Sequence, residues 1–443
     1  MTKPLRILFI NRMASLERGG GETFDLEVSR HLSMLGHKIT FLTGIPLFGS
    51  AKLQIGDNIQ NPTSNVQLSG PDKLHIPSQI NNIQLRSPYF GWFPWDKVKG
   101  GWRLRVADFT MFEWRAARWA YKHRDEFDII QICELPNIVC FLKSIISDKK
   151  LRFPKLVVRL TAPNYHDPRK GIPMADGIIA SGTSLAKLRT RGLGRAVNIP
   201  NGVDTDRFRP QSSNFRDEHH IEADEIVILY VARFQEFKNH AMLVRAFAEL
   251  VKEVKNVRLL LAGSGPLRGA IEQQISAAGL SSQVIILGEC PFDSLPWVYA
   301  SANINAITSN YESFCFAAIE GMASGLPVIS TDCGWVPELI GDSLPPIEKE
   351  WVVNGGDLPA NRFEHEVDGK RIRDVPGGLV TARNDHHSFS VALKRLVKSK
   401  AERNVMGGWN REKAVSEHRW TNSAQMLEIY YTKLLQTPSF GDE

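Results

Sequence analysis

Two glutamates, Glu312 and Glu320, lie eight positions apart in a segment rich in small residues. Residues 314–324 of this segment have the composition of a helix, with Ser313 as the predicted N-cap. Glu312 then precedes the helix, and Glu320 lies about 12 Å farther along at a rise of about 1.5 Å per residue. The two carboxylates of glycoside hydrolases lie about 5 to 9.5 Å apart, so this pair does not suit one glycosidic bond. The spacing suits two contacts with one extended ligand.

The predicted start of this helix lies between the two carboxylates. Backbone amides of residues 313–316 point out of a helix N-terminus, where a bound anion is stabilised. Gly325 marks the predicted end of the helix, and residues 327–331 are the predicted strand that follows. The first carboxylate, the anion site and the second carboxylate therefore follow one another along the chain. A nucleotide sugar has its sugar, diphosphate and ribose in the matching order.

The segment resembles that of the retaining GT-B glycosyltransferases of family 4, in which Glu-x7-Glu is followed by a small-residue helix and a Pro-Val strand. In that family the first glutamate lies by the donor sugar and the second binds the ribose. The resemblance implies these roles for Glu312 and Glu320, and donor contacts for Ser313, Phe314 and Cys315. The family usually has glycine at the positions of Ser313 and Cys315.

Two basic residues, Arg233 and Lys238, follow a predicted strand at 226–231. Open α/β sheets bind ligands at the carboxyl ends of their strands. Arginine offers a planar fork and lysine a point charge, and both suit a diphosphate leaving group. The matching family motif places this pair on the donor diphosphate, so the resemblance implies that Arg233, Lys238 and Glu312 are the catalytic residues.

Glycine turns follow the next predicted strands. Gly263 and Gly265 come after the strand at 257–262, and the resemblance makes them donor-binding residues. They do not form a dinucleotide fingerprint, because Arg268 stands where the third glycine of GxGxxG is needed, which argues against an NAD-dependent dehydrogenase. Glu289 follows the next strand, in a turn where the resembling family packs the nucleotide base.

The chain opens with a β-α-β pattern, in which a strand at 6–11 and a helix at 22–35 flank Gly20 and Gly21. This pattern predicts a Rossmann-like domain. Glycines before a helix either form only a tight turn or let backbone amides approach a ligand. The family's N-terminal Gly-Gly-x-Glu loop is similar, and implies that Gly20 and Gly21 contact the donor.

The acceptor side has the weaker signals. Residues 45–90 show no clear period and are predicted to form a long structureless excursion. Family members often have a histidine just after the strands that follow. Beyond the predicted strand at 155–160 this chain has Asn164 and His166, which are the acceptor-side candidates.

Tryptophan and basic residues gather at 89–124. This stretch holds five of the ten tryptophans, interleaved with eight lysines and arginines: Trp92, Trp95, Trp102, Trp114 and Trp119 are the tryptophans. Such a mixture suits a membrane interface, single-stranded nucleic acid, or an ordinary helix with buried indoles and solvated cations. Residues 1–200 hold 29 Lys+Arg and 16 Asp+Glu, a net charge of +13, whereas the remaining residues hold 25 and 32, a net charge of −7. The basic half should therefore attract an anionic partner.

The composition is that of a soluble globular protein. The chain has 443 residues, 43% of them hydrophobic and 23% charged, which is enough for two domains. We expect a cytoplasmic protein, with peripheral attachment to the inner face of the membrane as an option, because no apolar run is long enough for a span and the N-terminal one is too short for a signal peptide. The five cysteines lack CxxC spacing, which argues against a disulfide framework or a zinc site.

Taken in order along the chain, these motifs predict an α/β protein of the GT-B class, with two Rossmann-like domains facing a central cleft. The expected domains are an acceptor-binding one at 1–200, a nucleotide-sugar-binding one at 201–415, and a returning helix at 416–443. The resemblance implies retaining transfer of a sugar from a nucleoside diphosphate sugar to a hydroxyl of a glycan or lipid-linked acceptor. No metal, cofactor or nucleic acid is expected. A nucleotide-sugar epimerase of the same fold and a non-catalytic nucleotide-sugar or anion-binding protein are the alternatives.

Overall fold

A computed structural model describes residues 3–14, 20–46, 76, 80–87, 101–146, 152–160, 171–342 and 371–437. The chain divides into two compact units. Unit 1 comprises Met1–Asn201 and Trp420–Glu443, and unit 2 comprises Gly202–Arg419. Asn164, His166, Trp92, Trp95 and residues 343–370 lie outside the described residues.

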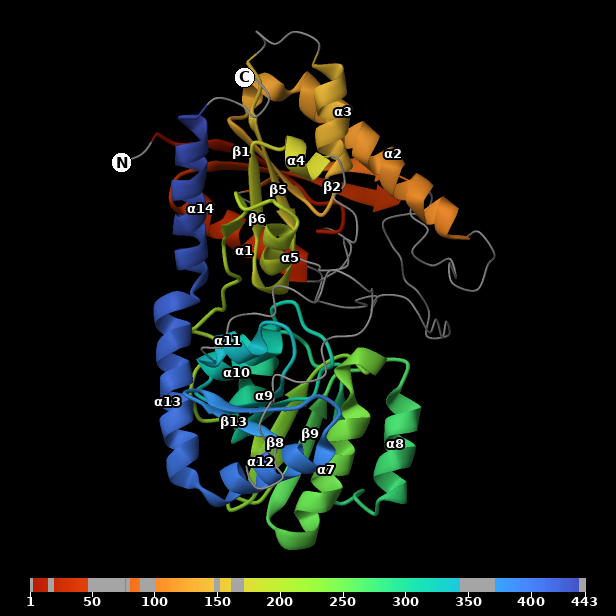
Figure 1. The fold of residues 1–443 in the computed structure, drawn as a ribbon, viewed down its shortest axis with the longest axis vertical. Coiled ribbons are helices and arrows are strands. Elements are labelled where there is room, and N and C mark those ends of the chain that lie inside the picture. The colour runs from red at the N-terminus through yellow and green to blue at the C-terminus, as the bar shows by residue number, and fades with distance from the viewer. Residues whose placement is uncertain are drawn as a thin grey trace. The chain divides into compact units, whose positions relative to one another are not determined.

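Unit 1 is built on a parallel sheet with the strand order β3-β2-β1-β4-β5-β6-β7 (Figure 1). Its strands are β1 (Arg6–Ile10), β2 (Lys38–Pro46), β3 (Asn81–Ser87), β4 (Ile129–Cys133), β5 (Lys155–Leu160), β6 (Gly177–Ala180) and β7 (Val197–Asn198). Its α-helices are α1 (Gly20–Met34), α2 (Gly101–Lys122), α3 (Asn137–Ile145), α4 (Gly171–Met174), α5 (Gly182–Thr190) and α14 (Trp420–Leu435). The strands β4 and β5 are buried throughout, as their continuous apolar runs predict.

The predicted structureless excursion at 45–90 is wrong at residues 81–87. These residues form β3, which pairs in parallel with β2 from Thr40 to Pro46 and makes the edge of the sheet. The sequence of β3, NNIQLRS, lacks an apolar run because an edge strand is covered less than a central one. Its partner β2 supplies the apolar residues that hold it in place.

Unit 2 has the sheet order β10-β9-β8-β11-β12-β14-β13, parallel except for the antiparallel pair β13 and β14. Its strands are β8 (Ile226–Val231), β9 (Val257–Ala262), β10 (Val284–Gly288), β11 (Ile304–Ile307), β12 (Val328–Thr331), β13 (Ile372–Val375) and β14 (Gly378–Thr381). Its α-helices are α6 (Phe215–Glu218), α7 (His240–Glu253), α8 (Arg268–Ala277), α9 (Leu295–Ala300), α10 (Phe316–Ala323), α11 (Val336–Leu339), α12 (His386–Lys398) and α13 (Lys400–Glu417). The sequence-predicted strands at 226–231 and 257–262 are confirmed residue for residue.

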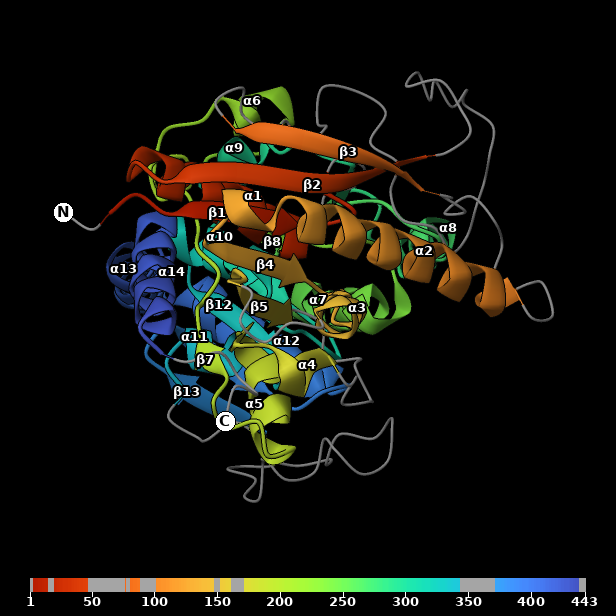
Figure 2. The ribbon, with the colours of Figure 1, turned by 90° about the horizontal axis from the view of Figure 1, so that it is seen from above.

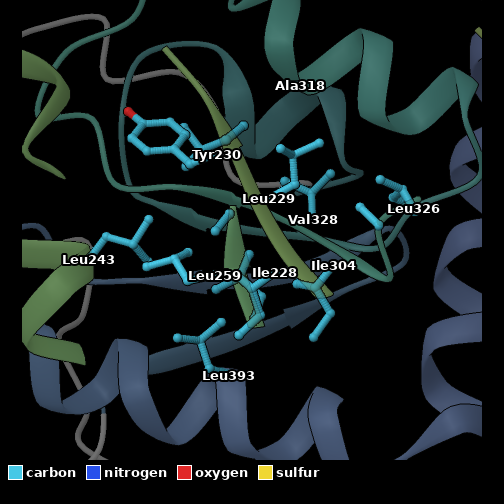
Figure 3. Packing of buried hydrophobic residues seen from close by; sticks show 14 of the residues in the cluster. Ile228, Leu229, Tyr230, Leu243, Leu259, Ile304, Ala318, Leu326, Val328 and Leu393 are labelled. Atoms are coloured by element: carbon cyan, nitrogen blue, oxygen red, sulfur yellow. The ribbon is translucent and has the colours of Figure 1, made fainter. Parts of the chain in front are cut away.

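The core of unit 2 forms around β8. Figure 3 shows Ile228 and Leu229 of this strand among Leu259 of β9, Ile304 of β11 and Leu243 of α7. These five side chains are fully buried. Tyr230 follows them on β8, and its hydroxyl points away from the apolar side chains. The apolar cluster therefore fixes the carboxyl end of β8, from which the polar residues of the site emerge.

Glycines let the helices of unit 2 approach one another closely. A Cβ atom on Gly407 of α13 would lie 2.1 Å from the backbone oxygen of Gly325, the residue that ends α10 in a left-handed conformation. Nearby, the Asn410 amide donates to the backbone oxygens of Leu326 (2.8 Å) and Gly377 (2.7 Å). The helix α13 therefore supports the end of α10 through backbone contacts that leave no room for a methyl group.

We predict opposite effects for two neighbouring glycines of α13. Gly407→Ala should lower the free energy of unfolding by about 1–3 kcal/mol, because the new methyl group meets the Gly325 backbone. Gly408→Ala should raise it by about 0.5–1 kcal/mol, because no atom lies within 4 Å of the new Cβ and alanine favours the helix. Urea unfolding of both variants measures the difference, and equal effects would contradict the packing described here.

Candidate functional site

The predicted donor residues of the second half of the chain gather at one edge of the unit 2 sheet. Arg233 and Lys238 follow β8, and Glu312 follows β11. Gly263 and Gly265 follow β9, where a parallel sheet brings the carboxyl ends of its strands together. This edge is where open α/β sheets bind ligands.

Close backbone contacts hold the loops after β8 and β9 together. Gly263 has a φ of +137°, and a Cβ there would lie 2.0 Å from the backbone oxygen of Ala232. A Cβ on Gly265 would lie 2.6 Å from the Phe234 oxygen. The Phe234 amide donates to the Ser264 oxygen at 2.9 Å. The two glycines thus position the loop that carries Arg233, whose side chain is exposed and has no acidic partner within the described part of the chain.

The centre of the site is an ion pair between Lys238 and Glu312. The Lys238 ammonium donates to Oε1 of Glu312 at 2.6 Å, and the Ser309 hydroxyl donates to the same oxygen at 2.7 Å. Glu312 is only 7% exposed. Burial alone would lower the pKa of Lys238, but the Glu312 carboxylate outweighs it and raises that pKa above the usual value. The lysine therefore stays charged at neutral pH.

Tyr230 supports both partners of this ion pair. Its hydroxyl donates to the Lys238 backbone oxygen at 2.8 Å and lies 2.8 Å from the Ser309 hydroxyl. Burial, and then the negative charge of Glu312, raise the pKa of Tyr230 well above its usual value, so the phenol stays neutral. The sequence did not mark Tyr230 or Ser309, because a tyrosine in the apolar run IVILYV is typical of the core.

His240 packs against the other side of Tyr230. Its ring centroid lies 4.8 Å from that of Tyr230 and 4.5 Å from that of Phe234. The pKa of His240 is lowered to about 3, because burial disfavours the charged ring and the Lys238 ammonium repels it. The ring is therefore neutral at neutral pH, and Lys238 is the cation of this group.

The start of α10 differs from that of the helix predicted at residues 314–324. Ser313 is not the N-cap, because α10 begins at Phe316 and Cys315 is the capping residue, with a φ of 72°. Gly334 constrains the chain at Glu312, because a Cβ on Gly334 would lie 1.7 Å from the backbone oxygen of Glu312. Such a left-handed cap favours glycine, which the resembling family usually has at the position of Cys315.

The side chains of this short segment face different environments. Burial, and then the charge of Glu312, raise the pKa of the Cys315 thiol well above its usual value, and Lys238 acts in the opposite direction. The Phe314 ring is 4% exposed and packs against Phe316 and His418. The Phe314 ring therefore belongs to the core of unit 2.

Glu320 is held separately, inside α10. Its Oε2 accepts a hydrogen bond at 3.1 Å from the Tyr299 hydroxyl, which also donates to the Ala317 oxygen at 3.2 Å. Glu320 is 8% exposed and Tyr299 is fully buried. The structure thus gives the two carboxylates different partners, Lys238 for Glu312 and a tyrosine for Glu320. Glu289, the other acidic candidate, is exposed after β10.

Gly20 and Gly21 begin α1 in unit 1. The Gly21 backbone oxygen lies 3.5 Å from a guanidinium nitrogen of Arg159, which is 1% exposed and stacks on the Phe24 ring at 3.6 Å. These contacts fix the first turn of α1 to the carboxyl end of β5. The predicted contact of the two glycines with the donor stays a prediction.

Two other findings concern the described residues only. No three of their His, Cys, Asp and Glu side chains are grouped so as to hold a metal ion. Among the same residues, no helix combines the length and the apolar character needed to cross a membrane.

Comparison of the whole chain with solved structures shows the GT-B fold. A sucrose-phosphate synthase from Thermosynechococcus elongatus aligns with a TM-score of 0.68 at 20% identity, covering 97% of this chain and 99% of the other. The Anabaena HepE structure in complex with UDP-glucose aligns with a TM-score of 0.62 at 16% identity, covering 97% and 100%. The expected α/β architecture of two Rossmann-like sheets is therefore confirmed.

Sequence comparison finds similarity to glycosyltransferases within unit 2. Residues 211–354 match the family model described as Glycosyl transferases group 1. The putative glycosyltransferase EpsF of Bacillus subtilis is 36% identical over 137 residues, which cover 30% of this chain and 35% of EpsF. The MMP alpha-(1->4)-mannosyltransferase of Mycolicibacterium hassiacum is 23% identical over 97% of this chain and 98% of that protein. The matches to several of the other curated relatives span about a third of those relatives' own length.

We predict that Ser309→Ala destabilises unit 2 through the Glu312 carboxylate. Loss of the hydroxyl removes one donor to Glu312 and the neighbour of Tyr230, and should lower the free energy of unfolding by about 1–3 kcal/mol. Tyr230→Phe should have an effect of similar size, and the double variant should lose less than the sum of the two. Urea unfolding measures all three. Ser281→Ala, at an exposed position, is the control and should change stability by less than about 0.5 kcal/mol.

We predict that His240 makes the protein less stable in acid. Its folded pKa of about 3 lies below its unfolded value of 6.5, so the unfolded chain takes up the proton first as the pH falls. The free energy of unfolding should therefore drop by about 2 kcal/mol more in the wild type than in His240→Leu between pH 7 and pH 5. Parallel curves for wild type and His240→Leu would contradict this assignment.

Proposed function

We propose that this protein is a retaining glycosyltransferase, which transfers a hexosyl group from a nucleoside diphosphate sugar to an acceptor hydroxyl without a metal ion. The observation that carries the proposal is the buried ion pair of Lys238 and Glu312 at the carboxyl edge of the unit 2 sheet, with the exposed Arg233 in the same loop as Lys238. The Glycosyl transferases group 1 match over residues 211–354 supports the same conclusion.

The two cations suit the charge that develops during transfer. The bond between the anomeric carbon and the diphosphate oxygen breaks, and its electron pair stays on the diphosphate. Lys238 would turn from Glu312 to a phosphate oxygen, and Arg233 would supply a second, bidentate contact. Preorganised cations in a partly buried site stabilise such charge strongly. They would supply the neutralisation that a divalent metal supplies elsewhere.

The two glutamates suit the two ends of the donor. Glu312, held by Ser309 and by Lys238, would orient the hydroxyls of the sugar. Glu320, held by Tyr299 within α10, would accept from the ribose hydroxyls. The acceptor oxygen would form the new bond to the anomeric carbon on the face that the diphosphate leaves, and its proton would pass to the departing phosphate. The configuration is then retained, as the family resemblance implies.

The names of the relatives suggest which donors to test first. One relative is named a GDP-mannose-dependent phosphatidylinositol monomannoside mannosyltransferase, and one structural neighbour holds UDP-glucose. We propose a UDP- or GDP-hexose donor and an acceptor that is a glycan or a lipid-linked precursor, bound by unit 1. We place the reaction in the cytoplasm, where nucleotide sugars are available.

A panel of UDP-, GDP- and ADP-sugars tests the proposal by thermal shift, with magnesium and with chelator. We expect one donor to raise the melting temperature equally in both conditions, because a ligand that prefers the folded state stabilises it. Incubation of that donor without acceptor, followed by product analysis, separates transfer from epimerisation. A donor that stabilises only with magnesium would exclude metal independence, and a panel without any shift would argue against the donor site.

We predict that Lys238→Ala loses at least about a hundredfold in turnover while Lys252→Ala, at an exposed position of α7, keeps wild-type turnover. Lys238→Ala also leaves Glu312 buried without its cation, which costs about 3–5 kcal/mol of stability. The double variant Lys238→Met with Glu312→Gln removes that unpaired charge and should recover stability while staying inactive. An active double variant would show that the pair is structural only.

A further inference from the structure

One face of α2 in unit 1 is exposed and combines apolar with basic side chains. At about 100° per residue its residues lie within one half of the helix circumference: Arg103, Val106, Met111, Trp114, Arg118 and Lys122. Val106 is 53% exposed, Met111 45% and Trp114 46%. Exposed apolar side chains gathered on one helix face need a partner that covers them. We call this set the α2 face.

The acidic residues of α2 lie on the opposite side of the helix. Asp108 is 4% exposed and forms an ion pair with Arg12 at 2.6 Å. Glu113 is 1% exposed and accepts a hydrogen bond from the Asn137 amide at 2.9 Å. Phe112 packs into the core between them. The two acids of the helix thus have partners within unit 1, and the charged residues of the α2 face are all basic.

The helix α2 lies at the outside of unit 1, with one side packed against the unit and the α2 face exposed. It packs against α3 and β3, and Figure 2 shows its N-terminal end extending beyond the strands of the unit 1 sheet. On the α2 face, the Arg118 guanidinium lies 4.8 Å from the Trp114 ring centroid. This cation–π contact keeps the Trp114 indole and the Arg118 guanidinium side by side on the α2 face.

We propose that the α2 face docks on an anionic lipid surface, with the helix lying along the membrane. Tryptophan and alkyl side chains bury at the level of the headgroups, and cations on the same face meet the lipid phosphates. The net charge of +13 over residues 1–200 adds long-range attraction to such a surface. The charged residues on this face keep the helix from crossing the bilayer.

Charge and shape favour lipid over the other occupants. Single-stranded nucleic acid stacks its bases on several aromatic rings, whereas Trp114 is the one exposed aromatic ring among the α2 side chains that the structure describes, a set without Trp102. The centre of a protein interface is depleted of charged residues, whereas arginine and lysine run along the α2 face at three of its six positions. The docking does not depend on the proposed sugar transfer, and it can be tested without any donor.

Flotation with lipid vesicles tests the proposal. The full chain is mixed with vesicles of phosphatidylcholine alone, or of phosphatidylcholine with an equal share of phosphatidylglycerol, at low and at high salt. We expect flotation with the anionic vesicles only, weakening as salt rises. Trp114→Ala should lower the partition coefficient about tenfold. Arg103→Gln with Arg118→Gln should lower it about thirtyfold.

Matched controls come from unit 2. The control variants are Trp297→Ala, at a side chain that is 48% exposed, and Arg245→Gln, at an exposed position of α7. Neither control should change the partition coefficient, and circular dichroism of every variant should match that of the wild type. The proposal is overturned if the wild type does not float, if it floats equally with neutral vesicles, or if the α2 variants bind as the controls do. Tighter binding to a single-stranded oligonucleotide than to anionic vesicles would overturn it as well.

Discussion

The buried ion pair of Lys238 and Glu312 is the interaction on which the candidate site depends. A carboxylate as buried as Glu312 is stable only when cations and hydrogen-bond donors surround it, and Lys238 and Ser309 supply both at less than 3 Å. The pair also acts on the charge of its neighbours: burial and then the Glu312 charge keep Tyr230 neutral, and burial and then the Lys238 ammonium keep His240 unprotonated. A site held in this way is organised before any ligand binds, so little reorganisation is left for the moment of binding.

The pair is held in place by backbone geometry more than by side-chain packing. Gly334 packs against the Glu312 backbone so closely that a methyl group would not fit between them. Gly263 packs in the same way against Ala232, in the loop that carries Arg233. These loops follow strands whose apolar residues fill the core of unit 2 (Figure 3). The packed sheet is therefore a rigid support for the polar residues at the carboxyl ends of its strands. The left-handed Cys315 belongs to the same set of constraints, since it turns the chain from Glu312 into α10. Strain of this kind persists where the surrounding structure holds it, as at functional sites.

Unit 1 shows a different use of charge. The acids of α2 are held inside the unit, where Asp108 pairs with Arg12 and Glu113 accepts from Asn137, whereas basic residues of the same helix lie on its surface. The α2 face is the clearest result of this sorting. A domain with such a surface suits work beside an anionic boundary, whereas the second half of the chain has a net charge of −7.

The sequence by itself determined the α/β architecture, because continuous apolar runs such as 155–160, 226–231 and 257–262 could only be buried strands. It also marked Arg233, Lys238 and Glu312, since their types and order along the chain indicate anion chemistry. Only the tertiary structure decided that Lys238 pairs with Glu312, and that Tyr230 and Ser309 support them, because residues 79 positions apart meet only through the pairing of β8 with β11. The start of α10 at Phe316, after the left-handed Cys315, was likewise apparent only from the tertiary structure. Local patterns predict local structure, whereas hydrogen-bond partners across a sheet depend on its strand order.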